Sequence, residues 1–557
     1  MKKNTILSIM TCAAMLLLTA ACSNDENNNP KEQPTQAVQF SFTNEDFGAD
    51  ETLSRATSAA ETKPQTVDLG DCEAEISVEN EPAVKTRGTM TNANGHYTIR
   101  AYQGGTLKGE MKGTFSGGAF TPDATSPKDI ILSAGTYDFI AFNDDVIPSG
   151  NDLTVDRTKA ETARMGTTTA NITATPQKQK VMFTMKHVGC RVHTQFVCQK
   201  DIPENITAKL EATAANVVPT TTAYHPATKA YTSTNGAMTA ENSNSPASTE
   251  TSYTASNYGQ DYAYTSTSSD YHYFLPTTEG SKLKLTFAAG TLFWKPLTGT
   301  IPQLNATLQM QAGKSYLVKI KLKPNYIYLM SDGTTGHFKD TTFGGGTKTP
   351  VGVVADPVAR VALALKDIGD GTLYYWWDPD SRPIYEDNTT IYKENQHDEY
   401  TDMDGYKWTW EAAGSTDGTI KANQQTDYPA FYAAGHYYPG VAPSGTLVGK
   451  KWYLAGLGEW AIYIYLELGF TKYIVDATHG LSYGILLEEA LTKVGGKILD
   501  TTGRERGKGY LMSTQVKTGG SSYSLTIEQR YYYKGGYFFR GYGVGNITGR
   551  IRPFIKY

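Results

Sequence analysis

The chain has 557 residues and a formal net charge of -5, and 19% of its residues are charged. This length requires more than one hydrophobic core. A charge so close to neutral supplies no basic field for nucleic acid, which we therefore exclude as an expected partner.

Residues 1–22 have the pattern of an export signal. Lys2 and Lys3 precede an apolar run, ILSIMTCAAMLLLTAA, that is too short to be favoured as a membrane span. Cys22 follows two small residues, and the whole pattern resembles a bacterial lipoprotein signal. The resemblance implies lipidation of Cys22, which would become the mature N-terminus; the alternative is an ordinary cleaved signal peptide that happens to contain this Cys. The next residues, SNDE, resemble the acidic tag that directs lipoproteins of Bacteroidota to the outer face of the outer membrane. We therefore expect a cell-surface protein that touches the membrane only through its lipid.

Three cysteines remain outside this segment: Cys72, Cys190 and Cys198. Cys190 and Cys198 lie on one predicted strand, about 26 Å apart at the rise of a strand, which is too far for a disulfide. Cys72 could pair with either of them, or all three could be buried thiols.

The chain after residue 22 begins with a polar segment, residues 23–37, that predicts a flexible tether. Runs with a period of two follow, among them AVQFSF, EAEISVE, HYTIRAYQGG and VMFTMKHVGCRVHTQFVC, and they predict an all-β region. A second group of such runs includes SKLKLTFAAG and SYLVKIKLKP. Residues 220–269 offer little apolar area to bury, so they predict a long decorated loop or a weak edge hairpin.

This region contains, in this order, AGTYDFIAFND, FTMKHVGCRVHTQF and LQMQAGKSYLVKIKLKP. The three pieces and their order resemble the fimbrillin family, the pilus subunits and associated lipoproteins of Bacteroidales. Residues 38–325 resemble that family, and the resemblance implies two tandem transthyretin-like β-sandwich domains, 38–178 and 179–325. His187 lies inside one of these apolar strands, where we expect a core residue with satisfied hydrogen bonds rather than a ligand.

The same resemblance implies assembly with other pilus subunits by donation of a β-strand, after an extracellular protease has cut the chain at an Arg. Arg55 and Arg87 both lie in polar, turn-like surroundings. The short spacing from Arg87 to the next strand favours Arg87. The alternative is that both are ordinary surface residues.

Residues 326–557 contain six of the seven Trp of the chain. EWAIYIYLELG and YGILLEEALTKVGG have helical spacing of apolar residues and end on Gly, and short β-rich runs follow, which predicts an α+β domain. KWYLAGLGEW and GRIRPFIKY resemble the C-type-lectin-like domains of bacterial surface proteins. The residues that match the pattern are Trp452, Leu454, Glu459, Trp460, Arg550 and Arg552, while Ala455 and Gly456 replace the usual Pro and Ser.

A long polar and aromatic insertion occupies residues 388–445, and loops of this length are usually functional or disordered. Recognition in the lectin-like fold falls to long loops on a rigid scaffold. The ligand-binding candidates are therefore Trp408, Trp410, Tyr432, Tyr437 and Tyr438, with Tyr531–Tyr533 as a further candidate run. Trp452 and Trp460 belong to the scaffold pattern and are expected in the core. For Tyr531–Tyr533, core packing is the alternative to ligand contact. Exposed rings stack on sugars or anchor a protein contact.

Motifs for catalysis, phosphate binding and zinc binding are absent from the sequence. Asp378 and Asp380 could form an acid–base pair, but Asp-Pro-Asp is commonly a turn. The calcium motifs of sugar-binding lectins are also absent from residues 326–557. We expect no enzyme, no metal and no cofactor, and we expect ligand binding to survive a chelator.

Together these patterns predict a mostly β protein made of two transthyretin-like sandwiches and an α+β C-type-lectin-like adhesive domain, residues 326–557. The predicted function is that of a fimbrial tip or minor subunit that binds a glycan or protein on host or bacterial surfaces. One alternative is an outer-membrane surface lipoprotein that binds such a ligand without entering a pilus. Another is a hydrolase with its carboxylates in the C-terminal domain.

Overall fold

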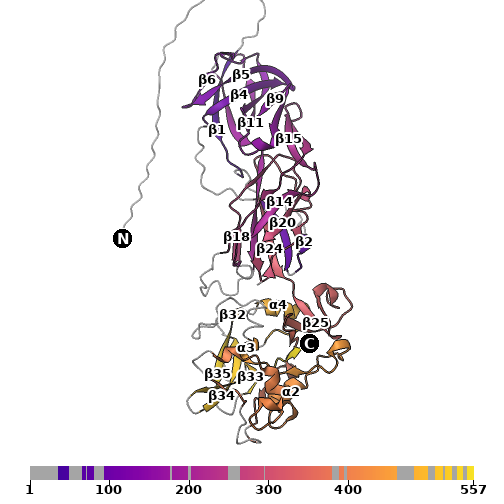
Figure 1. Ribbon diagram of the computed structural model, residues 1–557. Coiled ribbons are helices and arrows are strands. Elements are labelled where there is room, and N and C mark those ends of the chain that lie inside the picture. Colours follow the sequence, from indigo (N-terminus) through magenta and orange to yellow (C-terminus); the bar gives the residue numbers. More distant parts are fainter. Residues whose placement is uncertain are drawn as a thin grey trace, which may run out of the picture.

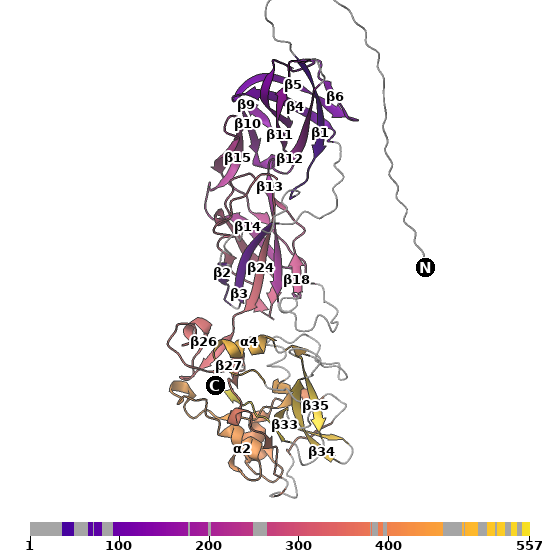
Figure 2. The ribbon, with the colours of Figure 1, turned by 180° about the vertical axis from the view of Figure 1, so that it is seen from behind.

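The structure is a computed structural model. It describes residues 36–48, 65–70, 72–80, 93–175, 179–198, 202–248, 264–293, 295–378, 380, 388–393, 398–460, 482–483, 485–499, 509–518, 521–529, 536–542 and 548–557. The fold is mostly β, as the sequence predicts. Its sheets form three units in a row, with β1 near one end and the C-terminal unit at the other (Figure 1), and the view from behind shows the same order (Figure 2).

The first unit consists of an eight-stranded sheet and a four-stranded sheet. Alternation of apolar and polar residues explains its packing: along β12, Val181, Phe183 and Met185 are buried, whereas Met182 is 65% exposed. The eight-stranded sheet has the order β6 (Ala119–Pro122), β5 (Thr106–Ser116), β4 (Gly95–Gln103), β8 (Gly135–Asn143), β11 (Arg164–Ile172), β12 (Gln179–His187), β1 (Gln36–Asn44) and β7 (Ile131–Leu132). The smaller sheet has the order β16 (Ala230–Gly236), β15 (Val218–His225), β10 (Asp152–Asp156) and β9 (Ile147–Ser149).

Strand β1 has a position of its own in this unit. It pairs in parallel with β12 from Val38↔Gln179 to Asn44↔Met185, and its other edge pairs with β7. Its inward side chains Val38, Phe40 and Phe42 are buried. The ring of Phe42 stacks on that of Tyr97 with 4.7 Å between centroids. A strand contributed by the N-terminus thus fills a gap near the edge of the sheet.

The second unit also contains two main sheets. Its core includes Phe196, Leu285 and Ile320, all fully buried. One sheet has the order β18 (Tyr264–Thr267), β13 (Cys190–Cys198), β24 (Ser315–Pro324), β3 (Cys72–Asn80) and β2 (Gln65–Asp68), with β19 (His272–Phe274) also paired to β13. The other has the order β17 (Glu241–Asn242), β14 (Thr207–Ala212), β20 (Leu283–Ala289) and β23 (Thr300–Ile301), and a two-stranded pair joins β21 (Thr291–Leu292) to β22 (Lys295–Pro296).

Two segments pair with a different unit from the one that their position in the chain predicts. The sequence EAEISVE belongs to β3, which pairs with β24 of the second unit from Tyr316↔Asn80 to Pro324↔Cys72. The hairpin β15–β16, in contrast, pairs with β10 of the first unit. It includes the start of the Ser- and Thr-rich stretch and corresponds to the hairpin alternative. Each of the two segments links one unit to its neighbour.

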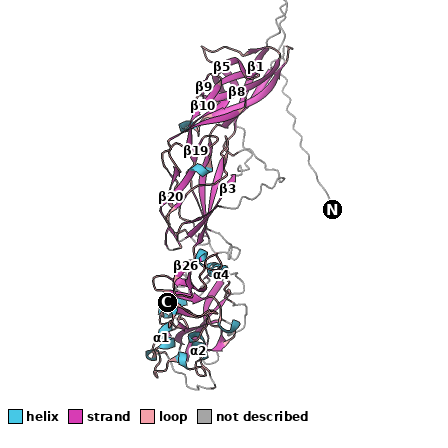
Figure 3. Ribbon diagram, turned by 90° about the vertical axis from the view of Figure 1, so that its right-hand side faces the viewer, coloured by secondary structure: helices cyan, strands magenta, loops and turns pink. Residues whose placement is uncertain are grey.

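The third unit mixes short helices with three sheets. Figure 3 shows that the helices, drawn in cyan, gather mainly in this part of the chain, whereas strands fill the other two units. The helices are α1 (Gly405–Trp410), α2 (Pro429–Gly435), α3 (Leu457–Glu459) and α4 (Ile485–Lys493). One sheet has the order β26 (Thr335–His337), β25 (Ile327–Met330), β27 (Pro350–Asp356), β28 (Val361–Ala364), β37 (Phe554–Lys556) and β31 (Trp452–Tyr453). Another has the order β30 (Tyr392–Lys393), β33 (Tyr510–Thr518), β34 (Ser521–Gln529), β35 (Gly536–Tyr542) and β32 (Ser482–Tyr483), and β29 (Tyr374–Tyr375) pairs with β36 (Thr548–Gly549).

The predicted helix in YGILLEEALTKVGG is confirmed as α4. Gly495, with a φ of 68°, follows its end, as expected for a glycine stop. The other predicted helix begins with α3, and most of its residues lie outside the described part of the chain. The terminal run GRIRPFIKY contains the predicted last strand, β37.

Apolar clusters and polar contacts join neighbouring units. At the joint between the first and second units, one apolar cluster combines Phe142 with Tyr224 of the hairpin and Leu275. At the joint between the second and third units, Asn325 donates to the carbonyl of Gly70 (2.9 Å), and an apolar cluster continues from one unit into the other. The Lys339 ammonium pairs with Asp68 (2.8 Å) at the same joint.

The three cysteines outside the export signal and His187 are buried and have structural roles. Cys72, Cys190 and Cys198 are buried thiols. The Sγ of Cys190 donates to the carbonyl of Phe274, and burial raises the pKa of this thiol. His187 is 8% exposed, and its Nδ1 bonds to the carbonyl of Glu161 (2.7 Å), which agrees with the expected core role.

Candidate functional site

The described part of the insertion, residues 388–445, contains β30, α1, α2 and several short 3-10 helices. Trp408 on α1 is fully buried in an apolar cluster that also contains Tyr428 and Phe431. The Trp408 Nε1–H donates to the carboxylate of Asp402 (2.9 Å). Trp408 was a candidate for ligand contact, but its ring is in the core of this unit and offers no surface.

Trp410 is also largely covered. Its Nε1–H donates to the carbonyl of Trp452 (2.7 Å), and the Lys451 ammonium lies 4.1 Å from the ring centroid. Gly435 packs so closely that a Cβ there would come within 2.7 Å of the Trp410 ring. Trp410 therefore supports the fold of the insertion more than it offers a ring face for stacking.

The remaining three candidates differ in exposure. Tyr437 packs edge-on against Trp452, with 4.9 Å between the ring centroids. Tyr432 stacks on His436 at 4.1 Å, and Tyr438 is 64% exposed. The half-buried Tyr432 and the exposed His436 and Tyr438 form what we call the α2 aromatic surface. His436 was not a candidate in the sequence, although it stands four residues after Tyr432, a spacing that brings side chains together on a helix.

The third unit also contains buried carboxylates. Asp402 accepts from Trp408 and from the Thr514 hydroxyl (2.6 Å), so it joins α1 to β33. Burial raises the pKa of the Asp402 carboxyl. Glu459 accepts from the Tyr453 hydroxyl (2.7 Å) and from the Gly456 N–H (2.9 Å), and burial raises its pKa to about 7. Both carboxylates use their lone pairs inside the protein, which is typical of structural groups.

Two cations of the third unit, Lys421 and Arg552, are buried as well. Lys421 donates to Asn388 (2.9 Å) and Ser415 (2.6 Å), which ties two parts of the insertion together. Arg552 on the terminal segment donates to the carboxylate of Asp367 (2.5 Å) and to the carbonyl of Leu365 (3.1 Å). Arg552 matched the lectin-like pattern in the sequence, but no sequence signal pointed to its partner.

The other residues predicted from the sequence either lie in a turn or fall outside the described part of the chain. Asp378 accepts from the backbone N–H of Asp380 (2.8 Å), which fits the turn interpretation. Cys22, Arg55, Arg87 and Tyr531–Tyr533 lie outside the described residues. Within the described ranges, no group of three or more His, Cys, Asp or Glu could hold a metal ion. None of the helices described is long and apolar enough to span a bilayer.

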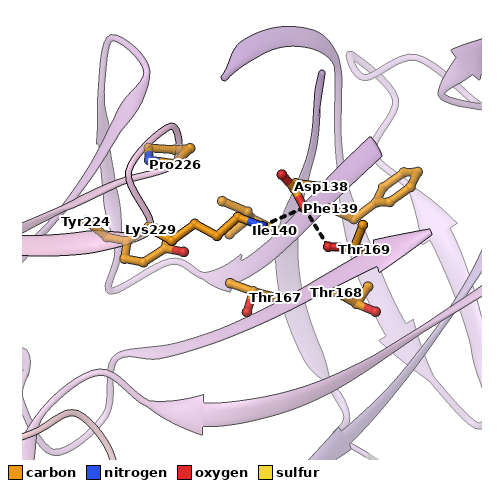
Figure 4. A pocket seen from close by; sticks show the side chains of 9 residues that line it. All are labelled: Asp138, Phe139, Ile140, Thr167, Thr168, Thr169, Tyr224, Pro226 and Lys229. Carbon is orange, nitrogen blue, oxygen red and sulfur yellow. Dashed lines mark hydrogen bonds and ion pairs between the residues drawn. The ribbon is translucent and has the colours of Figure 1, made fainter. Parts of the chain in front are cut away.

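A hollow of about 160 Å³ lies in the first unit beneath the tip of the hairpin β15–β16 (Figure 4). Lys229 at the tip pairs with Asp138 (3.0 Å) of β8, and Asp138 also accepts from the Thr169 hydroxyl (2.5 Å) of β11. The charges at this hollow thus satisfy one another, and they attach the hairpin to the first unit.

No family model and no curated protein matches the chain. Solved structures are similar to it at low identity. One is a fimbrial protein from Bacteroides vulgatus, with 13% identity over 41% of this chain and 91% of that one, at a TM-score of 0.25. Another is a fimbrial assembly protein from Parabacteroides distasonis, with 9% identity over 47% of this chain and 97% of that one, at a TM-score of 0.23.

Proposed function

We propose that this chain is a non-enzymatic subunit of a cell-surface pilus, in which a neighbouring subunit replaces β1 and the third unit makes the adhesive contact. The observation that carries the proposal is the place of β1. This N-terminal strand fills a gap between β12 and β7, and it contributes Val38, Phe40 and Phe42 to the core.

Loss of β1 would leave an apolar groove with unpaired backbone groups. The groove would be lined by Val181 and Phe183 of β12 and by Leu132 of β7, all of them in the same core cluster as β1. Such a groove accepts an extended segment by β-augmentation, because the backbone supplies hydrogen bonds and the pockets select alternate side chains. A strand from another subunit would therefore restore the sheet.

The strand pairing bears on where the chain would be cut. A cut after Arg55 would separate β1 alone, because β2 and β3 follow in the sequence. A cut after Arg87 would also separate β2 and β3, and with them the buried side chains Ala74 and Ile76 and the whole pairing of β3 with β24. We propose Arg55 as the processing site, although sequence spacing alone favours Arg87.

The third unit is the proposed adhesive part. Its α2 aromatic surface combines the stacked pair Tyr432 and His436 with the exposed Tyr438. Rings of this kind supply contact area at low entropic cost, either to the apolar face of a sugar or to a protein. The precursor would be held at the outer membrane by the lipid on Cys22 until assembly.

N-terminal sequencing of the protein recovered from cells tests the proposal. We expect a mature start at residue 56 in the assembled form. A start at residue 88 would keep the pilus function but move the processing site. A single start at Cys22 would contradict the proposed pilus subunit. It would support the second candidate function, a surface lipoprotein that retains β1. The close packing of β1 in its sheet is the observation that favours this second candidate.

A further inference from the structure

The residues that follow β1 occupy a basic and aromatic socket at the joint between the first and second units. Phe47 is 9% exposed, and its ring stacks on that of His187 with 3.7 Å between centroids and 14° between planes. The Tyr273 ring lies 5.7 Å from Phe47. A residue outside the regular strand is thus buried, although slightly less completely than the core residues of β1.

Arg191 of β13 covers the same ring. Its guanidinium carbon lies 5.0 Å from the Phe47 centroid and 3.9 Å from that of Tyr271. The Arg191 Nε–H donates to the Ser315 hydroxyl (2.9 Å), which fixes the orientation of the guanidinium. A cation held over a ring attracts it electrostatically, more so where water is excluded. A guanidinium held in this position favours an aromatic side chain over an aliphatic one.

The two acidic residues before Phe47 meet basic partners. Glu45 pairs with Lys186 (3.3 Å), and Asp46 pairs with Arg164 (3.2 Å). Burial lowers the pKa of His187 to about 4, so this ring is neutral near pH 7 and presents a stacking face to Phe47.

Backbone contacts set the register of the same four residues. The N–H of Glu45 donates to the carbonyl of Met185 (3.0 Å), and the N–H of Gly48 donates to the carbonyl of Gly313 (2.9 Å). Arg164 also donates to the carbonyl of Glu45 (2.9 Å). Because Met185 belongs to β12 and Gly313 precedes β24, residues 45–48 touch both units at once.

We propose that this joint socket, formed by Arg164, Lys186, His187, Arg191 and Tyr273, selects the partner subunit's donated segment. The occupant we commit to is a strand followed by acidic residues, an aromatic residue and a glycine, as in Glu45, Asp46, Phe47 and Gly48. The inference rests on the proposed strand exchange and adds a specificity site beyond the sheet groove. A small hollow of about 50 Å³, lined in part by Lys186, His187 and Gly313, lies beside the socket.

The test uses a full-length chain with an inserted recognition sequence for a specific protease directly after Arg55. After cleavage and removal of the N-terminal fragment, the affinity of synthetic peptides of residues 36–48 is measured. The peptides carry the native sequence, Phe47→Tyr, Phe47→Ala or Phe42→Ala. We expect Phe47→Tyr to bind within about twofold of the native peptide and Phe47→Ala to bind roughly tenfold more weakly, because the ring contacts are lost. Phe42→Ala reports on the sheet groove instead, and it should also weaken binding.

The outcomes separate the two proposals. Equal binding of the native and Phe47→Ala peptides, with weaker binding of Phe42→Ala, would overturn the joint socket and leave strand exchange standing. Absence of binding by every peptide would overturn strand exchange itself, and the socket with it. In the protein, Arg191→Met should reduce the difference between the native and Phe47→Ala peptides, as a double-mutant cycle measures. An unchanged difference would contradict the role of Arg191.

Discussion

The first two units and the third unit bury different kinds of residue. In the described residues of the first two units, Arg100 is the one buried Asp, Glu, Lys or Arg side chain. The described residues of the third unit include six that are buried, Glu399, Asp402, Lys421, Glu459, Arg550 and Arg552, and the side chain of Asp367 is 6% exposed. The sandwiches are thus stabilised mainly by alternating apolar strands, whereas the third unit depends on charged groups that need specific partners.

This difference predicts different responses to mutation and pH. Apolar packing tolerates changes of shape at moderate cost and does not titrate. A buried charge that loses its partner is far more costly, and its contribution changes with protonation. The third unit should therefore be the part of the chain most sensitive to single polar substitutions and to pH.

The largest effect is expected for Arg552→Met. The substitution leaves the carboxylate of Asp367 buried without its guanidinium, which should lower the free energy of unfolding of the third unit by about 3–5 kcal/mol. Denaturant unfolding followed by Trp fluorescence reports on this unit, because six of the seven Trp lie there. Lys450→Met, at an exposed position, is the control and should change it by less than about 0.5 kcal/mol. Equal effects of the two substitutions on the free energy of unfolding would contradict the claim that the third unit depends on its buried charges.

In the first unit we expect an apolar truncation to have the main effect. Ile99 is fully buried, so Ile99→Ala should cost about 2–4 kcal/mol through lost burial and a cavity. Ile131 is 63% exposed, and Ile131→Ala should change stability by less than about 0.5 kcal/mol. Calorimetry measures both at two pH values. A strong pH dependence of the Ile99→Ala effect would argue against a purely apolar core.

The pH dependence of the third unit should be traceable to Glu459. Its pKa of about 7 in the folded chain lies above the ordinary value, so its proton stabilises the fold at low pH. The unfolded carboxyl releases its proton first, and stability should fall by about 3 kcal/mol as pH rises from about 4.5 through about 7. Glu459→Gln should flatten this slope, because the amide stays neutral.

The control for this experiment is Glu411→Gln, at an exposed position of the same unit. It should leave the slope of stability against pH unchanged. A native profile that rises with pH between 5 and 7 would contradict the assignment to Glu459.

The smallest effect on stability is expected at the α2 aromatic surface. Replacing both Tyr432 and Tyr438 with Ala should change the free energy of unfolding by no more than about 1 kcal/mol, because their rings are only partly buried. The same variant should lose adhesion to host or bacterial surfaces. Trp408→Ala serves as the contrast, since it should cost about 3–5 kcal/mol by opening the core. Intact adhesion in the double variant would move the contact elsewhere.

The sequence predicts the sandwiches well because their information is local. The alternation along β12 and the apolar spacing of α4 are readable from neighbouring residues, and both elements form as expected. The assignment of β3 and of the hairpin β15–β16 to their sheets was not readable, because strand pairing depends on partners more than a hundred residues away or in the adjoining unit. Alternation identifies a strand and its buried face but not its neighbour.

The candidate site was predicted less completely for a related reason. Aromatic composition drew attention to the insertion, but it does not distinguish Trp408, whose Nε1–H binds a buried carboxylate, from Tyr438, whose ring is exposed. The sequence did not identify Asp402 and Asp367 as buried, because the residues next to a carboxylate in the chain do not distinguish a buried group from an exposed one. Their roles come from partners that only the folded chain brings together.

The central claim is that this chain is a pilus subunit whose third unit is presented for adhesion. Electron microscopy of cells labelled with an antibody against residues 326–557 tests it most directly. We predict label on fibres, concentrated at their ends. Label confined to the membrane, with fibres present but unlabelled, would contradict the claim.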